Sequence, residues 1–299
     1  MAKFNANIND ANQTLLKFVK KVYKNTNLSI IYKWFRKGKI KVNDKKIKDL
    51  KYIVKENDII DIYDKDKPIQ RDSFIPIDYS SLNVLYEDEN VLIVDKDQNI
   101  EIHSPVNICL DMLVKSYLFS KNNYIPDNEN SYVVSHVHRI DKLTRGIVIY
   151  AKNKMAHTQL IESINDKSKI KKLYLVKTNT SNIPTGLLSG FLTYDNFNKR
   201  SFFSETNINP NKYKKVQQIN QLINNEEFIY EVQILTGRKH QIRAIFSFYN
   251  SPIFNDLRYG ARKQKEDFFG LIAYKVEFNN LQGNLKNLNG LIIESNFTF

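Results

Sequence analysis

Short apolar segments separated by charged and polar stretches dominate the last two thirds of this chain of 299 residues. Segments such as NVLIVDK, SYVVSHV, GIVIYAK, KKLYLVK and EEFIYEVQIL have the length and the β-branched content of strands. Residues 153–166 and 241–250 instead repeat their apolar residues at helical spacing. Many strands with a few inserted helices predict a mixed, strand-rich domain over residues 82–299. Before it, residues 66–81 carry charges and two prolines, which is typical of a linker.

Residues 1–65 have a different pattern and predict a small α+β module. Apolar residues at helical spacing predict one helix near residues 15–22. A second helix is expected to begin at Asn27 or Ser29 and to end at Gly38. KIKV and IVKENDIIDIY then alternate like strands on either side of a turn.

Residues 33–48, KWFRKGKIKVNDKKIK, hold eight basic residues and one acid in a chain whose net charge is +13. A charge run is most often a solvated face, and an AT-rich genome also enriches lysine. Four of these residues gather around one predicted turn: Arg36, Lys37, Lys39 and Lys41. Because they are adjacent rather than dispersed, we expect a compact positive surface that binds a polyanion.

The phrase FRKGKIKVNDKKI resembles the surface that faces RNA in the RNA-binding domain named after the fourth small-subunit ribosomal protein. Asp44 stands where that family commonly has glycine, and an Asn-Asp pair also supports a tight turn. The resemblance implies that residues 1–65 bind RNA through the four basic residues around this turn.

Composition argues against several classes of protein. No apolar run approaches the roughly 20 residues that a membrane span needs, so we expect no membrane partner. The start, MAKFNANINDANQ, lacks the basic and apolar regions of a secretion signal. The single cysteine, Cys109, excludes an intramolecular disulfide and the usual cysteine zinc sites. We therefore expect a cytoplasmic protein, and we expect it to be a monomer.

The stretch SHVHRIDKLTRGIVIYAKN places a polar cluster at the edge of a predicted strand. The spacing of His136 and His138, with Asp141 nearby, is compatible with a metal site only if a further ligand such as His240 or His103 joins them. Without that ligand, histidines that hydrogen-bond within a loop are the more common outcome, and we predict no metal.

Three further phrases accompany this motif along the chain. VLYEDENVLIVDKDQNIEIHS precedes it, KKLYLV follows it with Tyr174, and LTGRKHQIRAIFSFYNSPIFNDLRYG adds Arg243. In this order the four phrases resemble those of the RluA family of pseudouridine synthases, over about residues 84–280. Departures from the family's usual residues loosen the assignment to a branch: Asp97, Arg145, Ala244, Ile245 and Asn255.

The resemblance implies an α+β protein, with a mixed, largely antiparallel β-sheet and flanking helices, that isomerises uridine in RNA to pseudouridine. This reaction breaks the bond between the ring nitrogen and the ribose and rejoins the ribose to carbon five without redox change, so no cofactor is expected. Asp141 is the implied nucleophile. Whether it attacks the sugar or the base, or first removes a sugar proton, stays open. Arg243 is implied to favour the ionised form of this carboxylate.

The same resemblance assigns roles to other residues of the polar cluster. Tyr174 offers a ring for stacking on uracil and a hydroxyl that could take or relay the carbon-five proton. Arg139 is expected to occupy the space that an everted nucleotide leaves, with a salt bridge as the alternative role. His138 and Thr144 are expected to shape the loop that aims the nucleophile, and Gly146 to allow a close backbone approach.

The pairing of these phrases with an RNA-binding module most resembles the RluC-like branch, so large-subunit ribosomal RNA is the expected partner. One alternative is a non-catalytic RNA-binding or ribosome-assembly factor that keeps the fold. Such a factor would be expected to lose at least one of Asp141, Tyr174 and Arg243. A second alternative, a metal-dependent nuclease built on the histidines, predicts a requirement for divalent ions.

Overall fold

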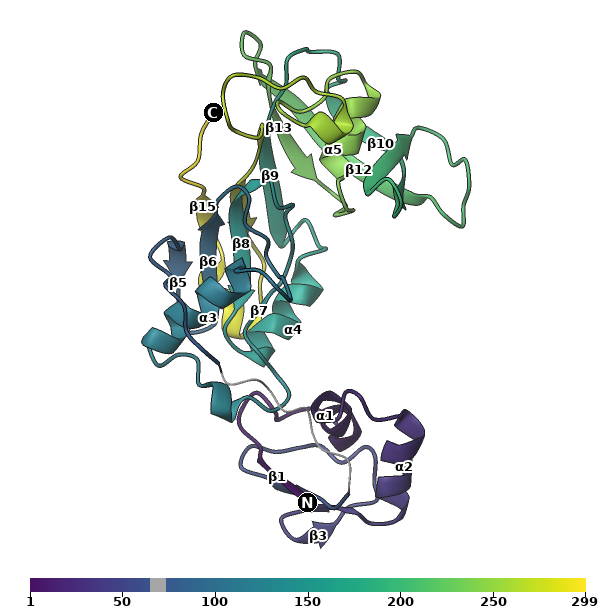
Figure 1. The fold of residues 1–299 in the computed structure, drawn as a ribbon, viewed down its shortest axis with the longest axis vertical. Helices are drawn as coiled ribbons and strands as arrows, with labels where there is room; N and C mark the ends of the chain where they lie inside the picture. The colour runs from purple at the N-terminus through teal and green to yellow at the C-terminus, as the bar shows by residue number, and fades with distance from the viewer. Residues whose placement is uncertain (65–73) are drawn as a thin grey trace. The chain divides into compact units, whose positions relative to one another are not determined.

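The computed structural model describes residues 1–64 and 74–299 (Figure 1). Contacts between residues divide the chain into two compact units. The first comprises Met1–Asp78, Lys115–Ser135 and Lys152–Met155, and the second comprises Tyr79–Val114, His136–Ala151 and Ala156–Phe299. Of the predicted linker, residues 66–73 lie outside the described part of the chain.

The first unit contains a four-stranded antiparallel sheet with strand order β1-β4-β2-β3. Its elements are β1 (Ala2–Asn5), α1 (Leu15–Val22), α2 (Leu28–Arg36), β2 (Ile40–Val42), β3 (Lys45–Lys46) and β4 (Ile59–Ile62). Both predicted helices are confirmed, and their apolar residues, among them Phe18 and Trp34, are buried in one core. Thr14 begins α1, because its hydroxyl accepts a hydrogen bond from the N–H of Lys17.

The basic stretch of residues 33–48 includes the hairpin of β2 and β3. Asn43 and Asp44 connect these strands with φ values of 49° and 65°, the left-handed backbone that a tight hairpin turn requires. The predicted turn is therefore confirmed. IVKENDIIDIY forms a strand only at its end, in β4, because a turn in which the Lys55 N–H bonds to Asp58 interrupts it. β1, which pairs with β4, was not predicted.

A second, eleven-stranded sheet has the order β11-β10-β12-β13-β9-β14-β8-β6-β5, with β15 beside β14 and β7 beside β8. Its strands are β5 (Asn83–Glu87), β6 (Val91–Lys96), β7 (Ser135–His136), β8 (Arg145–Ala151), β9 (Ile170–Lys177), β10 (Gly186–Asp195), β11 (Arg200–Ser204), β12 (Lys214–Asn224), β13 (Ile229–Ile234), β14 (Leu271–Phe278) and β15 (Ile292–Glu294). The strand pairs are antiparallel except β14 with β8. The predicted α+β class with a largely antiparallel sheet is confirmed.

The remaining helices are α3 (Leu110–Ser120), α4 (Lys154–Ser163) and α5 (Gln241–Phe248), and short 3-10 turns occur at Pro126–Asn128, Leu257–Tyr259 and Gly283–Leu288. α4 and α5 were predicted, whereas α3 was not. Leu160 of α4 packs with Ile147 and Ile149 of β8 in one apolar core. α5 lies at the other end of the sheet, beside β10 and β12 (Figure 1). In the part of the chain that the structure describes, no helix is both long and apolar enough to cross a bilayer.

The single parallel contact of the sheet brings β8 close to β14 at Gly146. This glycine has a φ of +113°, and a Cβ atom there would lie 2.3 Å from the carbonyl oxygen of Ala273. Only glycine fits such an approach, so the close backbone contact expected at Gly146 is confirmed. The contact fixes the start of β8, directly after the loop of residues 137–144 that carries the polar cluster.

Candidate active site

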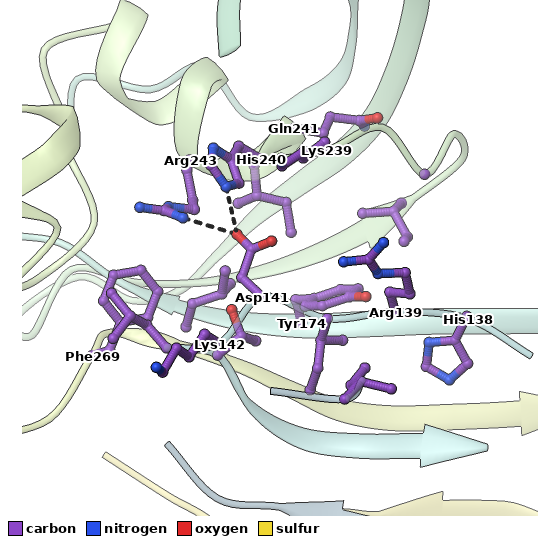
Figure 2. A pocket seen from close by; sticks show the side chains of 18 of the residues that line it. His138, Arg139, Asp141, Lys142, Tyr174, Lys239, His240, Gln241, Arg243 and Phe269 are labelled. Carbon is purple, nitrogen blue, oxygen red and sulfur yellow. Dashed lines mark hydrogen bonds and ion pairs between the residues drawn. The ribbon is translucent and has the colours of Figure 1, made fainter. Parts of the chain in front are cut away.

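A cavity of about 1110 Å³ opens within the second unit, and the polar cluster lines it (Figure 2). Its walls come from the loop before β8, from β9, from the segment that leads into α5, and from the segments before and after the 3-10 turn at Leu257–Tyr259. Asp141, Tyr174 and Arg243, which are far apart in the sequence, meet in this cavity. Its volume is large enough for a nucleotide-sized ligand.

The loop that carries Asp141 is held from below by a buried lysine. Lys96, at the end of β6, donates hydrogen bonds from Nζ to the carbonyl oxygens of Asp97 and Lys142, at 2.7 and 3.1 Å. Burial lowers the pKa of Lys96 to about 8. Within the loop, the N–H of Thr144 donates to the carbonyl oxygen of Asp141 at 3.1 Å. Both contacts fix the backbone on the C-terminal side of Asp141.

Arg243 of α5 joins two carboxylates. Its Nη1 lies 3.0 Å from Oδ2 of Asp141, while Nε and Nη2 donate to the two oxygens of Asp256 at 2.7 and 2.8 Å. Burial would lower the pKa of Arg243, but its hydrogen bonds and the charges of both carboxylates outweigh burial and raise it. The guanidinium also lies 4.8 and 5.4 Å from the ring centres of Tyr259 and Phe269. Arg243 is therefore fixed, charged and directed at Asp141.

His240 is a second nitrogen group beside Asp141, with Nε2 3.7 Å from Oδ2 of the carboxylate. Its Nδ1 lies 2.9 Å from the hydroxyl of Tyr259, and that hydroxyl accepts a hydrogen bond from the N–H of Ser201 at 2.6 Å. Because the Tyr259 oxygen accepts from Ser201, its own proton is free to point at Nδ1, which places the imidazole proton on Nε2. Burial lowers the pKa of His240 to about 4, against the opposing effect of Asp141. His240 is thus a neutral donor that faces the carboxylate.

His240 and Asp256 were not predicted as members of this site. From the sequence, His240 was considered only as a metal ligand, and Asp256 was assigned no role. His240 has a left-handed backbone, with a φ of 54°, directly before α5. This strained conformation, which non-glycine residues adopt infrequently, points its ring into the cavity and could not be read from spacing.

Tyr174 lies on β9 and is 7% exposed, beside Asp141 in the cavity (Figure 2). Burial raises the pKa of its hydroxyl, and the negative charge of Asp141 raises it further. The hydroxyl is therefore protonated at neutral pH. Its ring remains available to a flat ligand that enters the cavity.

The other predicted loop residues divide into enclosed and open groups. Nε2 of His138 accepts a hydrogen bond from the N–H of Ile149 at 3.2 Å, and burial lowers its pKa well below the ordinary value. Thr144 is buried at the base of the loop. Arg139 is exposed at the cavity, and among the described residues it makes no hydrogen bond or ion pair.

The histidines considered for a metal have other partners. His136 and His103 each bring Nδ1 to within 3.0 Å of one oxygen of Asp111, and His138 is bonded to β8. Within residues 1–64 and 74–299, no group of three or more His, Cys, Asp or Glu side chains is arranged to hold a metal ion.

The four basic residues predicted for RNA binding lie in the first unit, at the end of α2 and in β2. Arg36 and Lys37 are exposed. Lys39 bonds to Asp64 at 2.6 Å, and Nζ of Lys41 lies 5.1 Å from the ring centre of Tyr63. Two of the four cations therefore have partners within the unit, and two face solvent.

Comparison with known proteins identifies both units. A family described as RNA pseudouridylate synthase matches residues 90–248, and the S4 domain matches residues 13–60. Over 299 residues the chain is 44% identical to an uncharacterized RNA pseudouridine synthase of Mycoplasma capricolum, covering 99% of this chain and 98% of the relative. The chain therefore belongs to the RNA pseudouridylate synthase family, and it carries an S4 domain. Both resemblances proposed from the sequence are confirmed.

Two further comparisons extend this result. A protein of Buchnera aphidicola named ribosomal large subunit pseudouridine synthase C is 31% identical, covering 83% of this chain and 77% of the relative. The solved structure of human RNA pseudouridylate synthase domain containing 4 superposes with a TM-score of 0.54 at 17% identity, covering 72% of this chain and 88% of the human one. The latter likeness supports the fold.

Proposed function

We propose that this protein isomerises specific uridines of large-subunit ribosomal RNA to pseudouridine, with Asp141 as the nucleophile. The observation that carries the proposal is the carboxylate of Asp141, placed 3.0 Å from Arg243 beside the ring of Tyr174 in an open cavity. The choice of RNA rests on the relative from Buchnera aphidicola, whose name specifies the ribosomal large subunit. The S4 domain supports an RNA substrate in general.

The reaction requires a nucleophile and a group that moves one proton. The bond between N1 of the uracil and C1′ of the ribose breaks, and a bond between C5 and C1′ forms. C5 loses its proton and N1 gains one, so the product is an isomer of the substrate. Asp141 acts as the nucleophile that holds the reacting fragment during the exchange and is regenerated at the end.

The neighbours of Asp141 suit this role because they are buried themselves and stabilise its ionised carboxylate. Arg243 neutralises the charge, and Asp256 holds Arg243 in place from the buried side. His240 supplies an uncharged donor on the same oxygen side of the carboxylate. The second oxygen, Oδ1, is thereby left to face the substrate.

Tyr174 is assigned to stacking on the uracil. Its hydroxyl has a raised pKa and stays protonated, so it is a weak base in the protein without RNA. It can still relay the C5 proton by accepting it on oxygen while releasing its own. Arg139, exposed and without a partner in the described residues, is assigned to the space that the everted nucleotide leaves.

The four basic residues of the first unit, Arg36, Lys37, Lys39 and Lys41, are assigned to docking the RNA. Phosphate contacts of this kind position the substrate and do not select the target base. Selection of the uridine is assigned to the second unit, where the flipped base must fit the cavity beside Tyr174.

The test is release of tritium from transcribed large-subunit ribosomal RNA that carries uridine labelled at C5, with a chelator present. We expect release by the wild type and none by Asp141→Asn, which keeps the shape of the side chain. Asp267→Asn is the matched control, because Asp267 lines the same cavity but is bonded to Lys263 and is 88% exposed. Release by Asp141→Asn near the wild-type rate would remove Asp141 from its role.

The choice of RNA is tested by repeating the assay with transfer RNA and with ribosomal particles. Release from one of these alone would keep the isomerase and overturn the choice of free large-subunit RNA. No release from any of them would favour the non-catalytic RNA-binding factor. Cleavage of the RNA strand that requires divalent ions, without release of tritium, would favour the metal-dependent nuclease.

A further inference from the structure

A second group of cations lines the cavity on the side of β9, away from α5. Lys172, Lys167 and Arg139 all contribute to this wall, next to the ring of His138. Lys172 and Lys167 each lower the pKa of His138 through their charge, and Lys167 does the same to Lys172. The two lysines and the imidazole are therefore close enough to interact electrostatically.

Lys172 lacks a partner of opposite charge within residues 1–64 and 74–299. Among the described residues it makes no hydrogen bond or ion pair, although it is partly buried on β9. Its neighbour Lys171 points to the opposite face of the sheet and pairs with Glu277 at 3.3 Å. The strand thus places one lysine in an ordinary ion pair and directs the next, without a counter-ion, into the cavity.

The surroundings of Lys172 oppose its charge. Burial lowers the pKa of Lys172 to about 8, the charge of Lys167 adds to this effect, and no carboxylate counteracts them. Lys167 itself donates from Nζ to the carbonyl oxygen of Ile164 at 2.9 Å, which leaves its positive charge uncompensated by that contact. A cation in this position is stabilised most by an anion that enters from the cavity.

We propose that Lys172, together with Lys167, forms a phosphate subsite for the RNA backbone next to the everted uridine. This inference rests on the proposed function, because that function supplies an RNA strand to the cavity. Lys172 and Tyr174 are two residues apart on one strand, so their side chains leave the same face about 7 Å apart. A phosphate bound at Lys172 would therefore neighbour the nucleotide whose base stacks on Tyr174.

The chemistry of the wall favours phosphate over other ligands. The ammonium groups of Lys172 and Lys167 offer only donors, and the neutral His138 carries a proton on Nδ1, which has no partner among the described residues. Bases of RNA present both donors and acceptors, whereas a phosphate presents acceptors and a negative charge. Donors without acceptors therefore match the backbone.

The first experiment compares equilibrium binding of transcribed large-subunit ribosomal RNA across salt concentrations, with Lys172→Gln, Lys171→Gln and the wild type. Loss of one phosphate contact lowers the slope of log affinity against log salt by about 0.7–0.9, which corresponds to about five- to eightfold weaker binding at 0.1 M salt. We expect this change for Lys172→Gln and none for Lys171→Gln. Equal effects of the two variants would overturn the proposal, because both remove one charge from adjacent positions.

A second measurement separates binding from a structural role. Lys172→Arg keeps the charge and should restore most of the affinity, whereas a residue needed only for packing of β9 would not be rescued. Under saturating RNA, the rate of tritium release by Lys172→Gln should stay within about twofold of wild type, since the subsite holds the backbone and not the reacting atoms. A large loss of this rate with unchanged affinity would overturn the assignment to phosphate.

The outcomes also distinguish this inference from the proposed function. All binding measurements can be made in the Asp141→Asn background, where no turnover is needed. If Lys172→Gln loses a salt-dependent contact while the wild type releases no tritium from any RNA, the phosphate subsite is kept and the synthase is rejected. Normal tritium release by the wild type, with equal RNA affinities of Lys172→Gln and Lys171→Gln, would keep the synthase and reject the phosphate subsite.

Discussion

Two groups of charged residues in the cavity, one around Arg243 and one around Lys172, hold their charges in opposite ways. On the side of α5, the buried guanidinium of Arg243 meets two carboxylates, and His240 is held by Tyr259 with Nε2 facing Asp141 at 3.7 Å. On the side of β9, Lys172 and Arg139 have no partner among the described residues. Charges that are paired within the protein hold a fixed arrangement before RNA binds. Cations without partners leave the arrangement to be completed by the substrate.

This difference corresponds to the two tasks of the proposed enzyme. A nucleophile must be aimed, and misplacement by about 1 Å can lower a rate about a hundredfold, so rigid pairing is useful around Asp141. A backbone subsite must accept and release a flexible strand, and a cation already paired with a protein carboxylate would bind phosphate weakly. The comparison therefore predicts different consequences for mutations on each side: loss of rate near α5 and loss of affinity near β9.

The largest effect is expected for Asp256→Asn. Asp256 is 1% exposed, and its removal as a charge leaves Arg243 buried with half of its partners. We expect the rate of tritium release to fall about a hundredfold with little change in RNA affinity, and the free energy of unfolding to fall by about 3–5 kcal/mol. Single-turnover assays and denaturant unfolding measure these quantities.

Asp267→Asn is the control for this prediction, since its exposed ion pair with Lys263 should contribute no more than about 1 kcal/mol. If Asp256→Asn kept a normal rate while lowering stability, the buried pairing would serve the fold alone. The contrast between the two sides of the cavity would then lose its catalytic meaning.

The contact between Arg243 and Asp256 could not be predicted from the sequence. Three of the four ordered phrases carry Asp141, Tyr174 and Arg243 at recognisable positions, and the structure brings these three residues into one cavity. The role of Asp256 depends on a side-chain contact between α5 and the segment that follows it, which spacing does not encode. Lys171 and Lys172 are identical residues in one phrase, and only the alternation of β9 distinguishes them.

Strands were likewise predicted where their own composition identifies them, and they were missed where pairing with another strand stabilises them. Strands with a continuous apolar core, such as β6 and β8, were predicted because their composition differs from that of the neighbouring residues. β10 and β12 were not predicted: exposed residues alternate with buried ones along both strands, and the buried face of β12 carries the polar Gln218 and Asn220. Their stability comes from mutual pairing, which a single stretch of sequence does not reveal.

The first unit also holds cations with and without partners. Arg36 and Lys37 face solvent, whereas Lys39 and Lys41 contact Asp64 and Tyr63. The double variant Arg36→Ala, Lys37→Ala should lower the slope of log affinity against log salt by about 1.4–1.8, or about thirtyfold in affinity at 0.1 M salt. Lys51→Ala, Lys55→Ala is the control, with two exposed lysines of the same unit outside residues 33–48. Unchanged affinity of the first variant at every salt concentration would mean that this surface does not hold RNA.

A smaller effect tests the orientation of the His240 ring. Tyr259→Phe removes the hydroxyl whose proton points at Nδ1, so the imidazole is no longer fixed with its proton toward Asp141. We expect the rate of tritium release to fall about tenfold, roughly the effect of one hydrogen bond to a charged group. Tyr194→Phe is the control, because Tyr194 contacts the same ring edge-on, with centroids 5.9 Å apart. Equal losses in both variants would indicate a packing role for Tyr259.

The smallest expected effect is the change with pH in the contribution of Lys172 to RNA affinity. Since the pKa of Lys172 is about 8, this lysine is charged below pH 8 and neutral above it in the free protein. The five- to eightfold advantage of wild type over Lys172→Gln should therefore shrink as pH rises from 7 to 9, because the wild type must then take up a proton to bind phosphate.

The other groups that face Lys172 leave the direction of this pH dependence unchanged. Burial keeps His138 neutral throughout the range, and any loss of charge at Lys167 with rising pH weakens binding in both proteins. Titration of the RNA also cancels in the ratio of the two affinities. The ratio of wild type to Lys171→Gln should stay flat, since Lys171 pairs with Glu277 outside the cavity. If the affinity of wild type over Lys172→Gln is undiminished at pH 9, the ammonium group of Lys172 is stabilised within the protein. Lys172 would then be a paired charge like those near α5.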